Sequence, residues 1–491
     1  MAYIRYLPAE MLGEIFLHCL PERPREESQP NTKIAPILLC HVCSAWRTTA
    51  LRLPKLWTRL CMRSTFKVLY PLDISWLSHT TRSAYKELPM HPRTLDFLTW
   101  LGNNARSVPI DLYLIKIKEE NVESDVEKDG IILDGTPPGH EAMNTLEFAL
   151  ARLPSVRHFE MAINRYAMEV LCKAATPTTF ERLESLTVHQ YFHIGYKSRT
   201  KFVFAFPPAP RLRRLALTSY MNTLSFHWGQ LTHLCISCAI EQEDWLEILT
   251  HCENLSSGAF HLDGWGEGDL PSIVHPNLRQ LVIVPTTFRH VSFPGLKALR
   301  ILRNESISTF KLLADLLRKT PALTELHFDS EVFNSDRFEV PSNLLPEESI
   351  WLPSLLPDLS LLGFEFTECG TNSTGSVIVE LLKSEWVKLP PRNGRPSHLR
   401  ISFIPGIRGI PEDALPVVTA EELDSMKKSD IVRAIEEIRS ASEGNMNIEL
   451  RFPALGDEKR RWEFPDYFYD AEDLPRWDEV MGFHEQACLC E

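Results

Sequence analysis

The sequence predicts an α/β repeat protein in which a short helical region at the N-terminus precedes an irregular array of strand-and-helix units. Residues 7–20 and 37–60 carry apolar side chains at three- and four-residue steps, which is the pattern of helices with one apolar face. From residue 156 onward, a hexapeptide of the form L-x-x-L-x-L recurs with conservative replacements. Stretches with helical periodicity lie between several of these hexapeptides, so strands and helices are expected to alternate.

The first helical run is LPAEMLGEIFLHCL, from Leu7 to Leu20. Pro8 suits the first position of a helix because its missing N–H would have had no partner there. Glu10 favours the positive end of the helix dipole. The apolar stripe of this helix consists of Leu12, Ile15, Phe16, Cys19 and Leu20.

The second run is ILLCHVCSAWRTTALRLPKLWTRL, which spans residues 37–60 and begins beside Pro36. It repeats the helical design, and its stripe consists of Leu39, Val42, Cys43, Trp46 and Ala50. Leu53, Leu56 and Trp57 follow around Pro54, too close to this proline to belong to a long helix.

These two runs carry more apolar surface than two short helices can hide against each other. Burying a large side chain is worth roughly 1.5–3 kcal/mol, so leaving several exposed would cost on the order of 10 kcal/mol. We therefore expect this surface to be covered, either by the rest of the chain or by a separate protein.

The N-terminal region resembles the F-box motif in the order and spacing of its residues: Leu7-Pro8-x-Glu10, Ile15-Phe16, Leu20, Val42-Cys43-x-x-Trp46-Arg47 and Leu56-Trp57. In that family the motif docks on the Skp adaptor of a cullin–RING ubiquitin ligase, and the rest of the chain captures a substrate. The resemblance implies that the following residues make or support the adaptor contact: Leu7, Pro8, Ile15, Phe16, Leu20, Leu39, Val42, Cys43, Trp46, Leu56 and Trp57. The polar, proline-bearing insert 21–33 departs from the motif, but loop-closure entropy tolerates a longer turn. The alternative is an ordinary helical hairpin that its own chain covers.

The recurring hexapeptides predict a leucine-rich-repeat-like solenoid over residues 140–452. Five of the intervals between them, about 18 to 29 residues long, lie in or near the ~20–29-residue period of such repeats, and the intervals lengthen after Leu323. Asn164 and Asn304 occupy the ninth position of the repeat signature. Residues 255–262 are expected to shift register. The alternative is a non-repetitive α/β domain whose strands happen to begin with leucines. The blocks begin at Val156, Leu183, Leu212, Leu231, Leu278, Leu296, Leu323 and Leu359.

In a strand, successive side chains point to opposite faces, so the leucines of each block are expected to point inward and the residues between them outward. This outer face is mixed in charge and partly apolar, which suits a protein ligand. The candidate substrate face comprises Arg214, Ala216, Thr218, His233, Cys235, Ser237, Gln280, Val282, Val284, Arg300, Glu325, His327 and Asp329.

The remaining segments complete a four-part organisation. Residues 1–60 form the helical domain, and residues 61–139 form a linker region with a helix and a first strand over 95–115. Helices are expected over 141–153, 243–252, 308–320 and 419–440, and a last strand over 447–452. The aromatic and acidic segment 453–491 is either a cap that seals the last repeat or a mobile arm that helps to hold a partner.

Composition narrows the class of function. The net charge of −13 disfavours nucleic acid or an anionic membrane as a partner, and no apolar run approaches the ~20 residues of a membrane span. The eleven cysteines are odd in number and scattered, which favours a reducing cytoplasm or nucleus over a disulfide framework.

The sequence predicts no catalytic or cofactor site. Cys40-x-x-Cys43 and Cys235-x-x-Cys238 have the spacing of half a zinc site, but neither has a clear second half. The glycine-rich segment 264–268 lacks the strand-to-helix setting of a phosphate-binding loop. No nucleophile elbow, Walker loop or H-E-x-x-H motif is present.

We therefore expect a substrate-recognition subunit of a Skp–cullin–F-box ubiquitin ligase, which docks through residues 1–60 and binds an unidentified target protein on the repeats. The alternative is a non-ligase repeat scaffold whose F-box-like hairpin packs on its own solenoid. An enzyme with an unfamiliar site is a third possibility, which would require a deep pocket with strongly shifted titratable groups.

Overall fold

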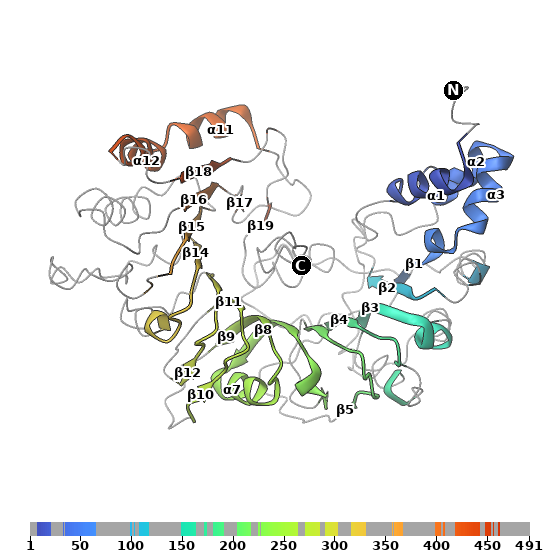
Figure 1. Ribbon diagram of the computed structural model, residues 1–491, viewed down its shortest axis with the longest axis horizontal. Coiled ribbons are helices and arrows are strands. Elements are labelled where there is room, and N and C mark those ends of the chain that lie inside the picture. Colours follow the sequence, from blue (N-terminus) through green and yellow to red (C-terminus); the bar gives the residue numbers. More distant parts are fainter. Residues whose placement is uncertain are drawn as a thin grey trace, which may run out of the picture. The chain divides into compact units, whose positions relative to one another are not determined.

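The computed structural model (Figure 1) describes residues 7–20, 33, 35–64, 99–100, 103, 108–116, 149–163, 171–173, 180–190, 204–217, 224–225, 227–263, 271–284, 290–302, 316–329, 356, 358–366, 398–403, 406–407, 418–441, 447–452, 455 and 460–461. The chain divides into two compact units, Met1–Gln230 and Leu231–Glu491. Both contain parallel β-structure and helices, so the protein belongs to the α/β class.

Unit 1 begins with three short helices, α1 (Ala9–His18), α2 (Ile37–Val42) and α3 (Ser44–Arg52), followed by a 3-10 turn, η2 (Pro54–Trp57). Pro8 lies at the N-cap of α1, one residue before the position that the sequence predicted. The turn at Pro54 confirms that no long helix continues there. The core of this helical cluster comprises Leu12, Phe16, Leu39, Ala50, Leu56 and Trp57.

The prediction that the second apolar run forms one helix with a single stripe is wrong. Cys43 is extended, with φ −162° and ψ 172°, and separates α2 from α3. Its Sγ accepts a hydrogen bond from the backbone N–H of Trp46 at 3.5 Å, so this thiol caps the second helix. As a result, Val42 and Cys43 are exposed, whereas Leu39 and Ala50 are buried.

The strands of unit 1 pair in parallel in chain order: β1 (Arg59–Ser64), β2 (Ile110–Lys116), β3 (Val156–Ile163), β4 (Ser185–Gln190) and β6 (Arg214–Leu217). Strand β1 was not predicted from the sequence, and it extends the sheet beyond the predicted first strand. Two short strands, β5 (Phe204–Ala205) and β7 (Leu224–Ser225), form a separate parallel pair. Short 3-10 turns, η3 (Leu153–Ser155) and η4 (Trp228–Gln230), precede β3 and follow β7.

Unit 2 contains a longer parallel series in chain order: β8 (His233–Glu241), β9 (Ser257–Asp263), β11 (Gln280–Val284), β13 (Ala298–Ile301), β14 (Glu325–Asp329), β15 (Leu361–Phe366), β16 (His398–Phe403) and β18 (Asn447–Arg451). Two small parallel pairs accompany it: β10 (Ile273–Val274) with β12 (Val291–Ser292), and β17 (Gly406–Ile407) with β19 (Arg460–Arg461).

The helices of unit 2 are α7 (Gln242–His251), α11 (Ala420–Lys427) and α12 (Asp430–Ala441). The first matches the helix predicted over 243–252. The single helix predicted over 419–440 is two helices. Thr419 starts α11 with a reciprocal capping box, in which its hydroxyl accepts from the N–H of Glu422 and its own N–H donates to that carboxylate. Of the predicted helices 141–153 and 308–320, only residues 149–153 and 316–320 lie within the described part.

The predicted hexapeptides all contain parallel strands. Except for β3, each of these strands begins two residues after the first residue of its block, and equivalent positions pair across the sheet, as in Gln280 with Ala298 and Ala298 with Glu325. In most blocks, the residue after the first leucine donates its N–H to the carbonyl of the equivalent residue in the preceding block. Lys297 donates to the carbonyl of Arg279 at 2.7 Å, for example. The first leucines themselves are at most 3 % exposed.

The predicted register shift at residues 255–262 is wrong. Leu255 is fully buried, and the N–H of Ser256 donates to the carbonyl of Thr232 at 2.9 Å, as the repeat requires. The irregularity lies in the preceding strand instead, where the register between β8 and β9 shifts between Ile236 and Ala239. Asn164 and Asn304 lie outside the described residues.

Within the described part of the chain, the structure contains no helix that is both long and apolar enough to cross a membrane.

Candidate binding surfaces

The N-terminal helices leave large apolar side chains uncovered. Met11 and Ile15 on α1 are 55 % and 42 % exposed, and Leu38 and Val42 on α2 are 41 % and 53 % exposed. Each pair is four residues apart, so its members are neighbours on the surface of their helix. We call these four residues the N-terminal apolar surface.

The burial of α1 explains how this surface arises. Leu12 and Phe16 face the core and are 6 % and 0 % exposed. Met11 and Ile15 each precede one of them by one residue, which is a rotation of about 100° around the helix. Because α1 is apolar on both of these faces, packing one against α3 leaves the other in solvent.

The residues predicted to contact an adaptor fall into three groups. Four are buried and can only support such a contact from beneath: Phe16, Leu39, Leu56 and Trp57. Three are half-buried: Leu7, Leu20 and Trp46. Four are exposed: Pro8, Ile15, Val42 and Cys43. Met11 and Leu38 were not among the predicted contact residues, although each lies four residues from a predicted one, Ile15 or Val42.

Aromatic packing explains why the largest of these side chains are buried. The rings of Phe16 and Trp46 lie 4.9 Å apart between centroids. Trp57 donates its indole N–H to the carbonyl of Ala50 at 2.9 Å and packs edge-on against Trp100 at 5.2 Å. These contacts hold α1, α3 and η2 together and leave the N-terminal apolar surface outside.

On the strands of unit 2, one face is apolar and fully buried, as predicted. The second leucine of each block is 0 % exposed, for example Leu234, Leu281, Leu299 and Leu326. On the opposite face, the strand register aligns one residue from every strand in a row that we call the central row. It consists of Cys235, Ala259, Val282, Arg300, His327, Gly363, Arg400 and Glu449.

Part of the predicted substrate face is not accessible. Cys235, Val282 and His327 are 7 %, 2 % and 6 % exposed, so the prediction that they line an open surface is wrong. Neighbouring strands are about 4.8 Å apart, so the side chains of adjacent strands cover much of one another on this face.

The other predicted substrate-face residues divide by exposure. Arg214 is exposed, and a larger group is half-buried: Ala216, His233, Gln280, Arg300 and Glu325. Thr218 lies outside the described residues. Ser237, Val284 and Asp329 lie in strands whose side chains at these positions are not described.

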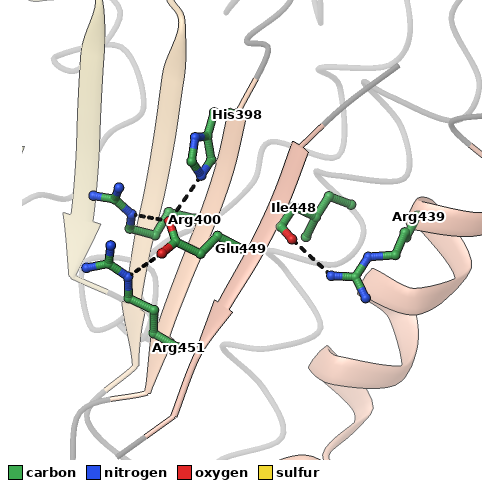
Figure 2. A network of polar contacts seen from close by, with 6 residues as sticks. All are labelled: His398, Arg400, Arg439, Ile448, Glu449 and Arg451. Atoms are coloured by element: carbon green, nitrogen blue, oxygen red, sulfur yellow. Dashed lines mark hydrogen bonds and ion pairs between the residues drawn. The ribbon is translucent and has the colours of Figure 1, made fainter. Parts of the chain in front are cut away.

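The C-terminal end of the central row carries a network of charged side chains that the sequence analysis did not identify (Figure 2). Arg400 on β16 donates its Nε–H to Oε2 of Glu449 on β18 at 2.9 Å, and Arg451 donates its Nε–H to Oε1 at 2.7 Å. His398 lies 3.1 Å from Oε2 through its Nε2. Partial burial would raise the pKa of Glu449, but the hydrogen bonds and charges of Arg400 and Arg451 outweigh it and lower that pKa to about 2.

His327 lies beside this network in the central row, and its ring covers the backbone of Gly363 on the next strand. A Cβ added to Gly363 would come within 2.8 Å of the Cε1 atom of His327, which is closer than real Cβ contacts. Burial lowers the pKa of His327 to about 3, and the charges of Arg300, Arg400 and Arg451 act in the same direction. His327 is therefore a neutral imidazole that packs among arginines.

The low pKa of His327 predicts a pH-dependent stability. Between pH 6.5 and about 3 the unfolded chain protonates this imidazole and the folded chain does not, so the free energy of unfolding falls as pH falls, by up to about 1.4 kcal/mol per pH unit. Comparing urea unfolding of the wild type and His327→Gln at pH 7.5 and 5 measures this, because only the wild type loses the imidazole contribution. The pH range lies above the window of Glu449, whose stabilisation is lost only as pH falls from 4.5 towards 2. A difference between wild type and variant that is the same at both pH values would contradict the prediction.

Among the residues that the structure describes, no group of three or more histidine, cysteine or acidic side chains is placed to hold a metal ion. No protein-family model matches the chain, and a search of curated proteins finds no significant similarity to it.

Proposed function

We propose that this chain is the substrate-recognition subunit of a Skp–cullin–F-box ubiquitin ligase in the cytoplasm or nucleus. Residues 1–60 act as an F-box that docks on the Skp adaptor, and residues 140–452 act as a leucine-rich-repeat-like solenoid that binds a target protein. The chain supplies no catalytic group. By holding adaptor and target on one polypeptide, it raises the effective concentration of the target near the ubiquitin-charged enzyme.

The observation that carries this proposal is the N-terminal apolar surface. Met11, Ile15, Leu38 and Val42 remain 41–55 % exposed although the core residues of the same helices, such as Phe16 and Leu39, are buried. Covering the exposed half of four such side chains is worth on the order of 4 kcal/mol, which is available to a partner that binds there. The F-box resemblance names that partner as the Skp adaptor.

The repeated geometry of the strands supports the second half of the proposal. The blocks differ in length, yet in each block that begins with a leucine this leucine is buried at the same position relative to its strand. The backbone hydrogen bonds between successive blocks also join corresponding residues. A stack of parallel strands with one buried leucine face, whose other face carries half-buried polar side chains such as Arg300 and Arg400, is the arrangement in which leucine-rich repeats bind proteins.

The alternative, a scaffold whose N-terminal hairpin packs on its own repeats, requires the apolar residues of the hairpin to be covered by the leucines. Phe16 and Trp57 are indeed buried, and among the described residues Phe16 contacts the ring of Trp46 while Trp57 contacts Ala50 and Trp100. The exposure of Ile15 and Val42 favours the docking proposal.

Co-expression of the full chain with the Skp adaptor tests the proposal. The wild type is expected to co-purify with the adaptor, and the double variant Ile15→Glu/Val42→Glu is expected to bind about 100-fold more weakly, because docking would bury two unpaired carboxylates. Val274→Glu is the matched control, since Val274 is 63 % exposed but lies on β10 in unit 2.

The controls of this experiment separate its outcomes. Val274→Glu is expected to retain the adaptor as the wild type does. If the wild type fails to co-purify under conditions in which an established F-box protein succeeds, the ligase proposal is rejected. Equal binding by the wild type and the double variant would reject the proposed docking surface.

A further inference from the structure

The geometry of Arg400 and Arg451 sets them apart from ordinary surface arginines. Each guanidinium uses its Nε–H on a different oxygen of the same carboxylate, Glu449. These two hydrogen bonds through Nε hold both guanidinium groups against the carboxylate of Glu449. Their terminal nitrogens point away from Glu449 (Figure 2). Among the described residues, no hydrogen bond or ion pair engages these terminal nitrogens.

The electrostatics around the two arginines favour an anion. The cluster contains three cations within reach of His327, namely Arg300, Arg400 and Arg451. Glu449 is the acid that pairs with two of them, and His327 stays neutral because its pKa is about 3. Arg400 and Glu449 are 25 % and 31 % exposed at the side chain, so the cluster is accessible but partly shielded from water, which strengthens its field.

We propose that Arg400 and Arg451 form a binding site for an oxyanion on a protein partner, either a side-chain carboxylate or a phosphate monoester. Paired guanidinium groups with fixed orientation present N–H donors in the planar geometry that such oxyanions accept. Glu449 accepts one hydrogen bond from each arginine and neutralises part of their charge, so its carboxylate competes with the ligand for the two guanidinium groups. The net charge of −13 on the whole chain argues against an extended polyanion such as nucleic acid.

This inference rests on the proposed function for its biological role, because it names the class of target that the strand face would capture. The site itself lies in unit 2 and is measured without an adaptor. Failure of the anion site therefore leaves adaptor docking through Ile15 and Val42 intact, and failure of adaptor docking leaves the anion site intact.

The experiment uses the immobilised full chain and three degenerate peptide pools that differ only in a fixed central residue, which is glutamine, glutamate or phosphoserine. The wild type is expected to retain the glutamate or phosphoserine pool at least tenfold more strongly than the glutamine pool. Comparison of the two anionic pools distinguishes a carboxylate from a phosphate ligand. Equal retention of all three pools would overturn the proposal.

Three variants and a control assign the effect to the cluster. Arg400→Gln and Arg451→Gln are each expected to lose the anion preference about tenfold, whereas Glu449→Gln removes the internal counter-charge and is expected to increase retention severalfold. Lys428→Gln, which removes a cation that pairs with Asp424 on α11, is the matched control and is expected to bind as the wild type does.

The arginine variants are expected to weaken retention of the anionic pools and the glutamate variant to strengthen it. Destabilisation of the protein would weaken retention in every variant, so the two effects can be told apart. If all three cluster variants weaken binding together, the network serves folding alone and the proposal is overturned. If inorganic phosphate binds by calorimetry in an Arg400-dependent manner but no pool is retained preferentially, the site takes a free ion and the proposal of a protein partner is overturned. All three variants are expected to retain adaptor binding.

Discussion

Replacing Trp57 by alanine is expected to destabilise the N-terminal helical cluster by about 3–5 kcal/mol, the usual cost of truncating a fully buried tryptophan. Trp57 is 1 % exposed, and its ring packs against Trp100. Its indole N–H donates to the carbonyl of Ala50 at 2.9 Å, which ties η2 to α3. The substitution removes this hydrogen bond and leaves a cavity between the two elements.

Hydrogen exchange of the full chain, read by mass spectrometry on peptides from residues 9–57, measures this loss of local stability. Val42→Ala is the control, because Val42 is 53 % exposed and its truncation is expected to change stability by no more than about 0.5 kcal/mol. Equal exchange in both variants would show that the division between buried core and exposed surface is wrong. That result would also remove the physical basis for a docking surface.

Replacing Gly363 by alanine is expected to destabilise unit 2 by about 1–3 kcal/mol through overpacking. The added Cβ would enter the space that the ring of His327 occupies, and it would come within 2.8 Å of Cε1. His327 is 6 % exposed and packs among neighbouring strands, so its ring has little room to move away. Glycine is required here because the ring approaches the backbone, and no unusual backbone angle is involved.

A double-mutant cycle tests this explanation by urea unfolding of the full chain. His327→Ala removes the ring, so Gly363→Ala in that background is expected to cost less than about 0.5 kcal/mol. The coupling energy would then account for most of the effect of the single variant. If Gly363→Ala costs the same with and without the ring, the contact between His327 and Gly363 is not the reason for the glycine.

The sequence predicted the strands of the repeats well because their signal is local. A leucine two positions before each strand and alternating apolar residues within it mark the strands that begin at Ser185, Arg214, Gln280 and Glu325. The strand β16 was not predicted because Pro396 stands two residues before it, where seven of the eight predicted blocks have a leucine. Leu255 was misread because the next two leucine positions of its block hold Gly258 and Phe260.

The helices were harder to predict because more than one backbone conformation is possible for the same apolar run. The apolar run around Val42 is periodic enough for one helix, yet Cys43 adopts an extended conformation and caps the next helix. The network of Arg400, Arg451 and Glu449 could not be predicted from the sequence for a different reason. Arg400 lies 49 residues from Glu449, and only the pairing of β16 with β18 brings them together.

By itself, the sequence determined which leucines of the repeat blocks enter the interior, because the two-residue period of a strand is a property of the local backbone. Only the tertiary structure decided which of two apolar faces of α1 is covered, since Leu12 and Phe16 differ from Met11 and Ile15 in neighbours and not in hydrophobicity. It also decided that Arg400, Arg451 and Glu449 meet, because strand register is fixed by packing between segments that are distant in the chain.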